Sequence, residues 1–246
     1  FDDAIAAYNK FRRAGKGTAD NLRDVDRQIQ FCINAKELMK FPLDVTFENL
    51  GSTVNSAYAD YYPYVPSDES FIIFNSHRPD EGAEKVKEDG SYPASVYISK
   101  VVDGKFSKAK EISSPIPKDN GEKEVIGLTA TGDMMLIYYT NDNGVGDIYS
   151  TSTNRDKKFV AATKLEENIN SPKAEEIAAC INSEGNVLYF ASNREGGIGG
   201  TDIYKSQKLP NGKWGMAQNM GPEINTPYDE DFPNISPDGK TKTNLL

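Results

Sequence analysis

Residues 187–204 read VLYFASNREGGIGGTDIY: an apolar strand, a glycine-rich polar turn and the start of a second strand. The same order of residue types occurs twice upstream. There Phe74-Asn75-Ser76-His77-Arg78 precedes Ser95-Val96-Tyr97, and Tyr138-Tyr139-Thr140-Asn141 precedes Asp147-Ile148-Tyr149. Self-similarity at a fixed spacing is the mark of a repeat architecture. The sequence therefore predicts a β protein built from repeated units.

Two further sequence segments recur at the same spacing as these. The aromatic residues Phe106, Phe159 and Trp214 each follow a short turn that ends in lysine, and they stand a little over fifty residues apart. Residues 55–65 align with residues 225–235. Four repeated segments per unit predict four strands per unit. A four-stranded unit of this length that repeats around an axis is a β-propeller blade.

Residues 1–40 have a different pattern. Apolar residues recur there at spacings of three and four on both sides of Gly15 and Gly17, which is the period of an amphipathic helix. Pro42 ends the pattern, because proline has no N–H for a helix interior. We therefore expect a mainly β fold, an incomplete propeller of four-stranded blades preceded by two α-helices that end a helical domain.

The second expected domain, 41–246, holds about three full blades and the start of a fourth. The units run over 55–117, 118–170 and 171–225, and the fourth begins at 226. Because 47–55 lines up with 217–225, the end of a unit, we expect 43–50 to be a ring-closing outer strand. The rest of that blade would come from sequence after residue 246. No aromatic and aliphatic strand pattern follows Asp238-Gly239, so we expect no strand there and a chain that is truncated or incompletely represented.

The composition narrows the function classes. The 246 residues carry 37 Asp and Glu against 28 Lys and Arg, a net charge of −9, which argues against sequence-independent nucleic-acid binding. One histidine and two cysteines rule out a zinc site of four Cys and His side chains and nearly exclude a histidine-based triad. We expect no nucleic-acid partner, no cofactor, no metal and no catalytic residue.

Acidic residues gather where each unit begins. If this acidic segment leads into the innermost strand of each blade, its carboxylates would form a ring around one mouth of the central channel. Such a ring suits a cation, a basic peptide or an amino sugar. The alternative is that these are solvated loop acids that bond neighbouring blades. The candidate binding residues are Asp60, Tyr61, Glu124, Glu176, Asp229 and Asp231.

Other repeated residues are better explained by structural roles. They are Arg78, Arg194, Asp147, Asp202, Phe106, Phe159 and Trp214. The two arginines end the second strand of their units, where arginine can bridge to an acid of a neighbouring blade. The two aspartates lack EF-hand spacing, so we expect them to bond turn backbone rather than calcium. The three aromatic residues are expected to pack between blades.

Several spaced motifs resemble one known family. They lie at 32–39, 48–51, 60–63, 188–194, 196–204 and 225–233. Over essentially all of 1–240 the chain is similar to periplasmic Bacteroidetes proteins that join tetratricopeptide helices to a TolB-like or WD-like propeller and an OmpA-like domain. The resemblance implies that 1–40 ends a tetratricopeptide-like segment. It also implies an exported protein associated with the outer membrane, with members in type IX secretion and gliding.

The resemblance also sets the expected partners. They are one or more envelope proteins, with membrane contact only indirect, through a lipid anchor or a partner. Peptidoglycan would be bound only through the OmpA-like domain, which lies outside this sequence.

We expect a non-enzymatic protein-binding or scaffold module of an outer-membrane-associated periplasmic complex. The alternative is a glycan or small-ligand receptor that uses the acidic channel mouth and nearby tyrosines. A third hypothesis, a hydrolase, would need convergent carboxylates about 5–10 Å apart, one of them with a raised pKa.

Overall fold

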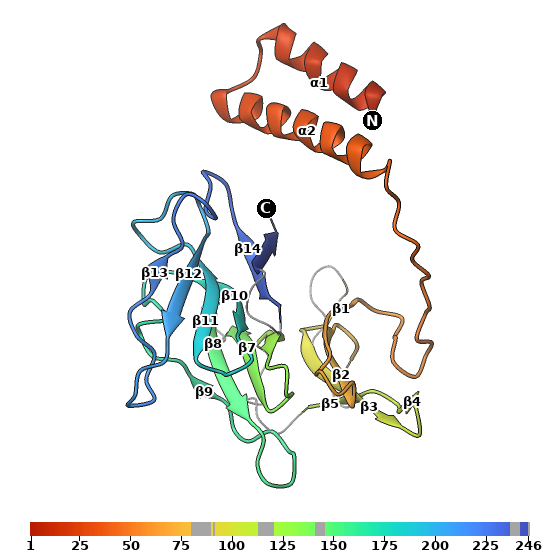
Figure 1. Cartoon of the computed structure of the whole chain (residues 1–246), viewed down its shortest axis with the longest axis vertical. Helices are drawn as coiled ribbons and strands as arrows, with labels where there is room; N and C mark the ends of the chain where they lie inside the picture. Colours follow the sequence, from red (N-terminus) through yellow and green to blue (C-terminus); the bar gives the residue numbers. More distant parts are fainter. Residues whose placement is uncertain (80–89, 91, 113–120, 141–145, 237–241, 246) are drawn as a thin grey trace. The chain divides into compact units, whose positions relative to one another are not determined.

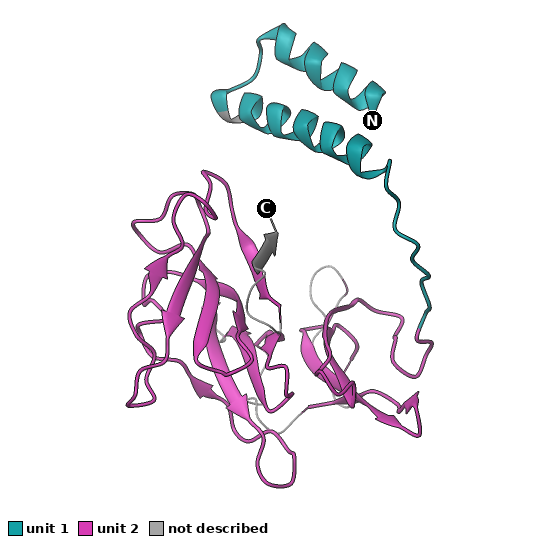
Figure 2. Ribbon diagram, in the orientation of Figure 1, with its two compact units in different colours: residues 1–49 teal, residues 50–246 magenta. Residues whose placement is uncertain are grey.

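The computed structural model describes residues 1–79, 90, 92–112, 121–140, 146–236 and 242–245. The chain divides into two units, Phe1–Asn49 and Leu50–Leu246 (Figure 2). Each unit has its own internal contacts.

Unit 1 contains the helices α1 (Asp2–Ala14) and α2 (Ala19–Leu38). Helix α1 ends at Gly15, whose left-handed backbone (φ 61°) favours glycine. Thr18 begins α2: its hydroxyl accepts from the N–H of Asn21, whose side-chain oxygen accepts from the N–H of Thr18. The two predicted helices are therefore present. Within the described residues, no helix is long and apolar enough to cross a membrane.

Unit 2 is built from short antiparallel strands (Figure 1). Blade 1 contains β1 (Asp60–Tyr64), β2 (Phe71–Ser76), β3 (Ser95–Val102), β4 (Lys105–Phe106) and β5 (Lys110–Glu111). Blade 2 contains β6 (Lys123–Leu128), β7 (Met134–Thr140), β8 (Gly146–Ser152) and β9 (Thr163–Lys164). Blade 3 contains β10 (Glu176–Ile181), β11 (Val187–Ser192), β12 (Asp202–Gln207) and β13 (Gln218–Asn219). A fourth blade begins with β14 (Asp231–Ile235) and β15 (Lys242–Leu245).

The blades stack side by side through their first strands. Strand β6 contacts β1, β2 and β3, strand β10 contacts β6, β7 and β8, and strand β14 contacts β10, β11 and β12. Within each of the first three blades the strands pair in chain order, and β5 also pairs with β3. This radial stacking of meanders confirms the predicted fold class, an incomplete β-propeller after N-terminal helices.

Strand β7 shows how the sequence builds the core. Its neighbours in the chain alternate between the two faces of the sheet, as strand geometry requires. Leu136 packs toward blade 3 with Phe190, whereas Met135 and Ile137 pack toward blade 1 with Ile73. All five side chains are fully buried. A strand covered on both faces therefore appears in the sequence as an unbroken apolar run.

The three repeated aromatic residues lie in different surroundings. Trp214 is buried in the cluster between blades 2 and 3. Phe159 is half-buried against the cluster between blades 1 and 2. Phe106 packs against a cluster made only of residues 54–109, so its contacts lie within blade 1 and the chain that leads into it.

The structure changes one expectation about the C-terminal end. We predicted no strand after Asp238-Gly239, yet β15 forms and pairs with β14. Pairing is made by backbone groups, so it does not need the apolar pattern on which that prediction rested. Residues 43–50 belong to no strand, and the Phe47 side chain is 93% exposed. Ring closure by this segment stays a prediction.

A buried asparagine completes the short outer strand of blade 2 and that of blade 3. The side-chain oxygen of Asn225 accepts from the N–H of Ile203 (2.8 Å), and its amide donates to the Ile203 carbonyl (3.0 Å). Asn170 makes the same pair of bonds to Ile148, at 2.8 and 2.9 Å. The amide group therefore substitutes for a strand residue where β9 and β13 have only two.

Replacing Asn225 by alanine is expected to lower the free energy of unfolding by about 1–3 kcal/mol, because the buried N–H and carbonyl of Ile203 lose their partner. Urea denaturation measures this. The exposed Asn211→Ala, which removes one turn hydrogen bond that water can replace, is expected to cost less than about 0.5 kcal/mol. Equal losses in the two variants would contradict the role of Asn225.

Candidate functional site

The first residue of β10, Glu176, is fully buried and bound within its own blade. Its Oε1 accepts from Ser192 Oγ (2.7 Å) and from Arg194 (3.0 Å), and its Oε2 accepts from the N–H of Ser171 (3.0 Å). Arg194 also donates to the carbonyl of Ile169 (2.5 Å), in the connection from blade 2. This one carboxylate therefore links the inner strand, the second strand and the preceding blade.

Aromatic rings cover the arginine of this network. The guanidinium of Arg194 lies 4.9 Å from the ring centroids of both Phe190 and Tyr204. A cation this close to aromatic rings gains electrostatic stabilisation.

Asp60, the first residue of β1, repeats this arrangement in blade 1. It accepts from Ser76 Oγ (2.6 Å), from Arg78 (2.6 Å) and from the N–H of Ser56 (2.6 Å). Arg78 also donates to the carbonyl of Val54 (2.9 Å). The predicted arginine bridge to a neighbouring blade's acid is therefore wrong: each arginine binds its own blade's acid and reaches the preceding chain through a carbonyl.

Glu176 and Asp60 differ in pKa because they differ in burial. Desolvation raises the pKa of Glu176 above its usual value, and the hydrogen bonds from Ser192 and Arg194 offset only part of that effect. Asp60 is less buried; desolvation acts in the same direction, but the bonds from Ser76, Arg78 and Ser56 outweigh it and lower its pKa.

The same acid position recurs in the other two blades. In blade 2 it is Glu122, whose backbone carbonyl accepts from the N–H of Thr140 and whose carboxylate accepts from the N–H of Ala94 (2.6 Å). In blade 4 it is the fully buried Glu230, which accepts from the N–H (2.9 Å) and the hydroxyl of Thr226. Both carboxylates therefore accept hydrogen bonds from nearby described residues.

Of the two aspartates expected to bond turn backbone, Asp202 accepts from the N–H groups of Ile198 (2.5 Å) and Gly199 (3.1 Å). Asp147 instead pairs with the side chain of Lys164 on the neighbouring strand β9 (2.7 Å). Asp229, a predicted binding residue, accepts from the N–H of Thr201 (2.9 Å).

A second group of side chains lies where the inner strands of blades 1, 2 and 4 meet. Tyr61 donates to Glu124 Oε1 (2.6 Å), and its ring packs edge to face on Tyr62, with centroids 4.9 Å apart. Tyr62 lies against Phe232, with centroids 4.5 Å apart. We call Tyr61, Tyr62, Glu124, Asp231 and Phe232 the axial cluster; all five are half-buried.

Backbone geometry directs the aromatic side chains of this cluster. Tyr62 and Phe232 have φ of 50° and 46°, in a region that non-glycine residues rarely adopt. Each lies at a β-bulge, and each is followed by a proline, Pro63 or Pro233, which cannot donate to the strand ladder. Strained backbone of this kind is common at binding sites.

The acids of the axial cluster differ from Glu176 and Asp60 in having no basic partner among the described residues. Neither Glu124 nor Asp231 forms an ion pair with a described residue. Burial raises the pKa of Asp231, and the nearby Asp229 adds to the effect. Burial also raises the pKa of Tyr62, with further contributions from Glu124 and Asp231, so both carboxylates act on one phenol.

His77 adjoins the cluster. Its Nε2 lies 3.3 Å from Tyr61 Oη, and its Nδ1 lies 2.5 Å from the carbonyl of Tyr92. Of the predicted binding residues, the structure brings together Tyr61, Glu124 and Asp231. Asp60, Glu176 and Asp229 are bound elsewhere. Sequence reasoning missed Tyr62 and Phe232, although the repeated aromatic-proline step was a usable signal.

Comparison with known proteins finds structural matches only. No protein-family model and no curated protein matches the chain. TolB from Acinetobacter baumannii aligns with 79% of this chain and 39% of its own length, at 17% identity and a TM-score of 0.51. A protein assigned to TolB from Agrobacterium tumefaciens aligns with 77% of this chain and 70% of its own, at 16% identity and a TM-score of 0.46. A prolyl endopeptidase aligns with 77% and 24%, at 15% identity and 0.40.

The match to the Acinetobacter protein shows a TolB-like β-propeller fold. The chain spans well under half the length of the Acinetobacter protein.

Replacing Arg194 by leucine is expected to lower the free energy of unfolding by about 3–5 kcal/mol at pH 7, because Glu176 keeps its charge in a buried site without a cation. Urea denaturation across a pH series measures this. The control Arg155→Leu, at an exposed position, is expected to change stability by less than about 0.5 kcal/mol.

The deficit of Arg194→Leu is expected to depend on pH. Losing Arg194 raises the folded-state pKa of Glu176 further, while its unfolded pKa stays near 4.5. The cost of ionisation is therefore absent below about pH 4.5 and grows as the pH rises toward 7. A deficit that is constant from pH 4 to 7 would contradict an ionised Glu176–Arg194 pair.

Proposed function

We propose that this chain is a non-enzymatic protein-binding module that takes a cationic segment of a partner protein at the axial cluster. The observation that carries this proposal is the pairing of aromatic side chains with two carboxylates that lack a basic partner among the described residues. Elsewhere, the acids that begin β1 and β10, Asp60 and Glu176, are each paired with an arginine. The axial acids therefore have capacity for a ligand.

Charge and ring geometry favour a cation over other ligands. Tyrosine faces attract lysine and arginine side chains, and half-buried carboxylates hold them more strongly than exposed ones do. The net charge of −9 draws basic segments toward the chain. Such attraction raises the association rate and falls with added salt.

We place the module in an exported, outer-membrane-associated complex. The motif resemblance and the TolB-like fold support this assignment. Its finer form is the Bacteroidetes family with tetratricopeptide, propeller and OmpA-like parts, similar to the type IX secretion and gliding-associated lipoprotein PorE. The partners are then envelope proteins.

The domain division is also a proposal, with 1–40 as the helical end and 41–246 as propeller. Support comes from the turn after 43–50. The N–H groups of Val54 and Asn55 donate to the Gly51 carbonyl (3.2 and 2.9 Å), as those of Ile224 and Asn225 do to Gly221 (3.1 and 2.8 Å). A unit end therefore has the same local structure before blade 1 as it has after blade 3.

The second candidate function is a glycan receptor, because sugars also stack on half-buried tyrosines such as Tyr62. Enzymatic activity is not part of the proposal. The single histidine, His77, has both ring nitrogens next to oxygen atoms, of Tyr92 and Tyr61, rather than beside a serine or cysteine.

A labelled pentalysine peptide tests the proposal by fluorescence anisotropy, with pentaglutamate as the charge-reversed control. Asp231→Asn and Glu124→Gln are each expected to weaken pentalysine binding about fivefold, because each removes one partly screened charge pair. Glu223→Gln, at an exposed position, is expected to change it less than twofold.

Equal affinities for all variants, or equal binding of pentaglutamate, would contradict the cationic site. Saturable binding of chitotriose that is lost in Tyr62→Ala, without pentalysine binding, would favour the glycan receptor. An envelope-extract pull-down with wild type and Asp231→Asn then identifies the partner protein.

A further inference from the structure

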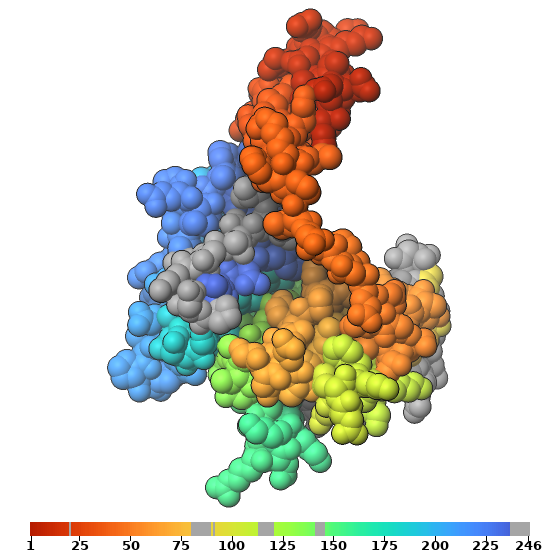
Figure 3. All heavy atoms as spheres, turned by 45° about the vertical axis from the view of Figure 1, so that its right-hand side comes forward, coloured from red at the N-terminus to blue at the C-terminus, as the bar shows by residue number. Residues whose placement is uncertain are grey.

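A cavity of about 500 Å³ lies between blades 1 and 2, on the side of the inner-strand hairpins. The turn before β2, the turn before β7 and the hairpin after β8 surround it. In Figure 3 that hairpin projects from the lower end of unit 2, next to the atoms of blade 1. The volume is within the range of about 300–1,000 Å³ typical of small-molecule sites.

The wall of this cavity is apolar and comes from both blades. Phe71 and Ile98 line it from blade 1, Ile112 from the chain after β5, and Phe159 from blade 2. All four are half-buried against the core between the blades, so the wall is held by packing. The cavity can therefore take an apolar body of a ligand without rearrangement.

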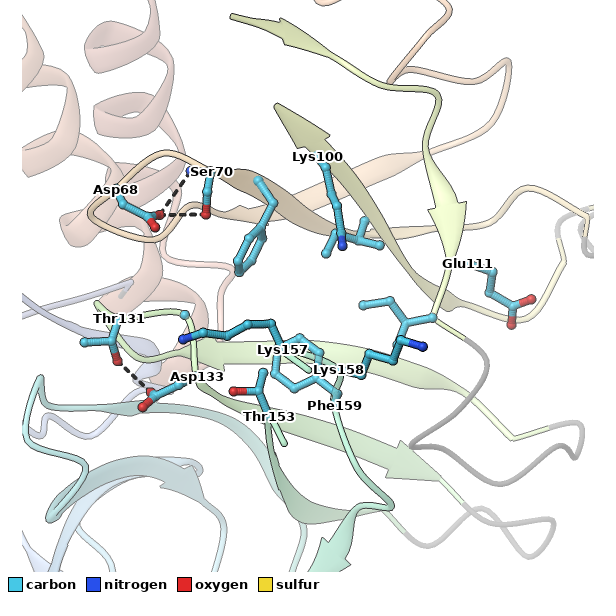
Figure 4. A pocket seen from close by; sticks show the side chains of 14 residues that line it. Asp68, Ser70, Lys100, Glu111, Thr131, Asp133, Thr153, Lys157, Lys158 and Phe159 are labelled. Atoms are coloured by element: carbon cyan, nitrogen blue, oxygen red, sulfur yellow. Dashed lines mark hydrogen bonds between the residues drawn. The ribbon is translucent and has the colours of Figure 1, made fainter. Parts of the chain in front are cut away.

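Three lysines surround the cavity: Lys100, Lys157 and Lys158. None of them forms an ion pair within 4 Å with a described residue. Three acids also line the cavity: Glu111 on one side and, at the opposite end, Asp68 and Asp133, with the amino group of Lys157 beside them (Figure 4).

Asp68 and Asp133 are already bound. Asp68 accepts from the hydroxyl of Ser70 (2.7 Å), and Asp133 accepts from Thr131 (2.6 Å) and Thr129 (2.7 Å). Those bonds lower both pKa values, and Lys157 lowers them further. Lys157 therefore balances the acidic end, which leaves Lys100 and Lys158 as the cations near the centre of the cavity.

The chemistry of the cavity departs from the blade repeat. Ile98 and Lys100 occupy the strand positions that Ser150 and Ser152 occupy in blade 2, counted from the shared tyrosine of the third strand. Blade packing therefore does not demand an isoleucine and a lysine there. Because the fold does not require Ile98 and Lys100 at these positions, we attribute them to ligand binding.

We propose that this cavity binds a monovalent carboxylate carried on an apolar body, with the carboxylate held by Lys100 and Lys158 and the body lying on the Phe71, Ile98 and Phe159 wall. Such a group occurs on an acyl chain and on the free C-terminus of a peptide with an apolar last residue. The site is separate from the axial cluster, so either proposal can fail without the other.

Saturation-transfer NMR on the full chain, with octanoate and octanol as a charged and an uncharged probe of equal length, tests this proposal. We expect octanoate to bind with a Kd on the order of 1 mM, as its size allows, and octanol at least fivefold more weakly. N-acetyl-Leu-Phe and its amide are the charged and uncharged probes for a peptide ligand. Stronger binding of the free acid than of octanoate assigns the site to peptide C-termini, and the reverse order assigns it to acyl chains.

Two variants test the lysines. Lys100→Ser introduces the residue type that blade 2 already tolerates at Ser152, and Lys158→Gln changes an exposed hairpin position, so both are expected to fold. Each is expected to weaken octanoate binding about fivefold, and the exposed control Lys213→Gln less than twofold. Octanoate affinity within twofold of wild type in both variants, equal binding of octanol, or no binding of either acid would overturn the proposal.

Discussion

The carboxylate at the start of each inner strand, fully buried in blades 3 and 4, is the interaction on which unit 2 depends. In blade 3 it is Glu176, which holds Ser192 and Arg194 of its own blade while Arg194 reaches the carbonyl of Ile169 in the connection from blade 2. A buried ion pair contributes little net stability, because desolvation offsets its attraction, but removing one partner is costly. Its main effect is therefore on specificity: it fixes where each blade begins relative to the previous one.

This constraint explains why the axial acids, one or two residues further along the chain, can bind a ligand. Glu230 accepts two hydrogen bonds from Thr226, whereas its neighbour Asp231 accepts one from the N–H of Phe232 and has no basic partner among the described residues. The bulges at Tyr62 and Phe232, next to prolines, direct aromatic rings to the meeting point of the inner strands. A rigid frame thus presents a strained and incompletely paired cluster, which is a common arrangement for a binding site.

The sequence predicted the blades well, because a strand buried on both faces, such as β7, reads as an unbroken apolar run. It did not predict the register of the acids. Blade 2 begins Glu122-Lys123-Glu124 and blade 4 begins Asp229-Glu230-Asp231, so neighbouring residues offer the same chemistry. Only the pairing with Thr140 and Thr226 distinguishes the structural acid from the axial one, and that pairing is three-dimensional. Strand β15 was missed because backbone pairing leaves no apolar signature.

The free energies of unfolding of Glu230→Gln and Asp231→Asn at pH 7 test this division most directly, since the two residues are adjacent. Glu230→Gln is expected to lose about 1–2 kcal/mol, because an amide cannot accept both bonds from Thr226. Asp231→Asn is expected to lose nothing or to gain stability, because burial raises the pKa of Asp231 and its charge is a cost to the fold. The opposite order, with Asp231→Asn the more damaging change, would contradict the account.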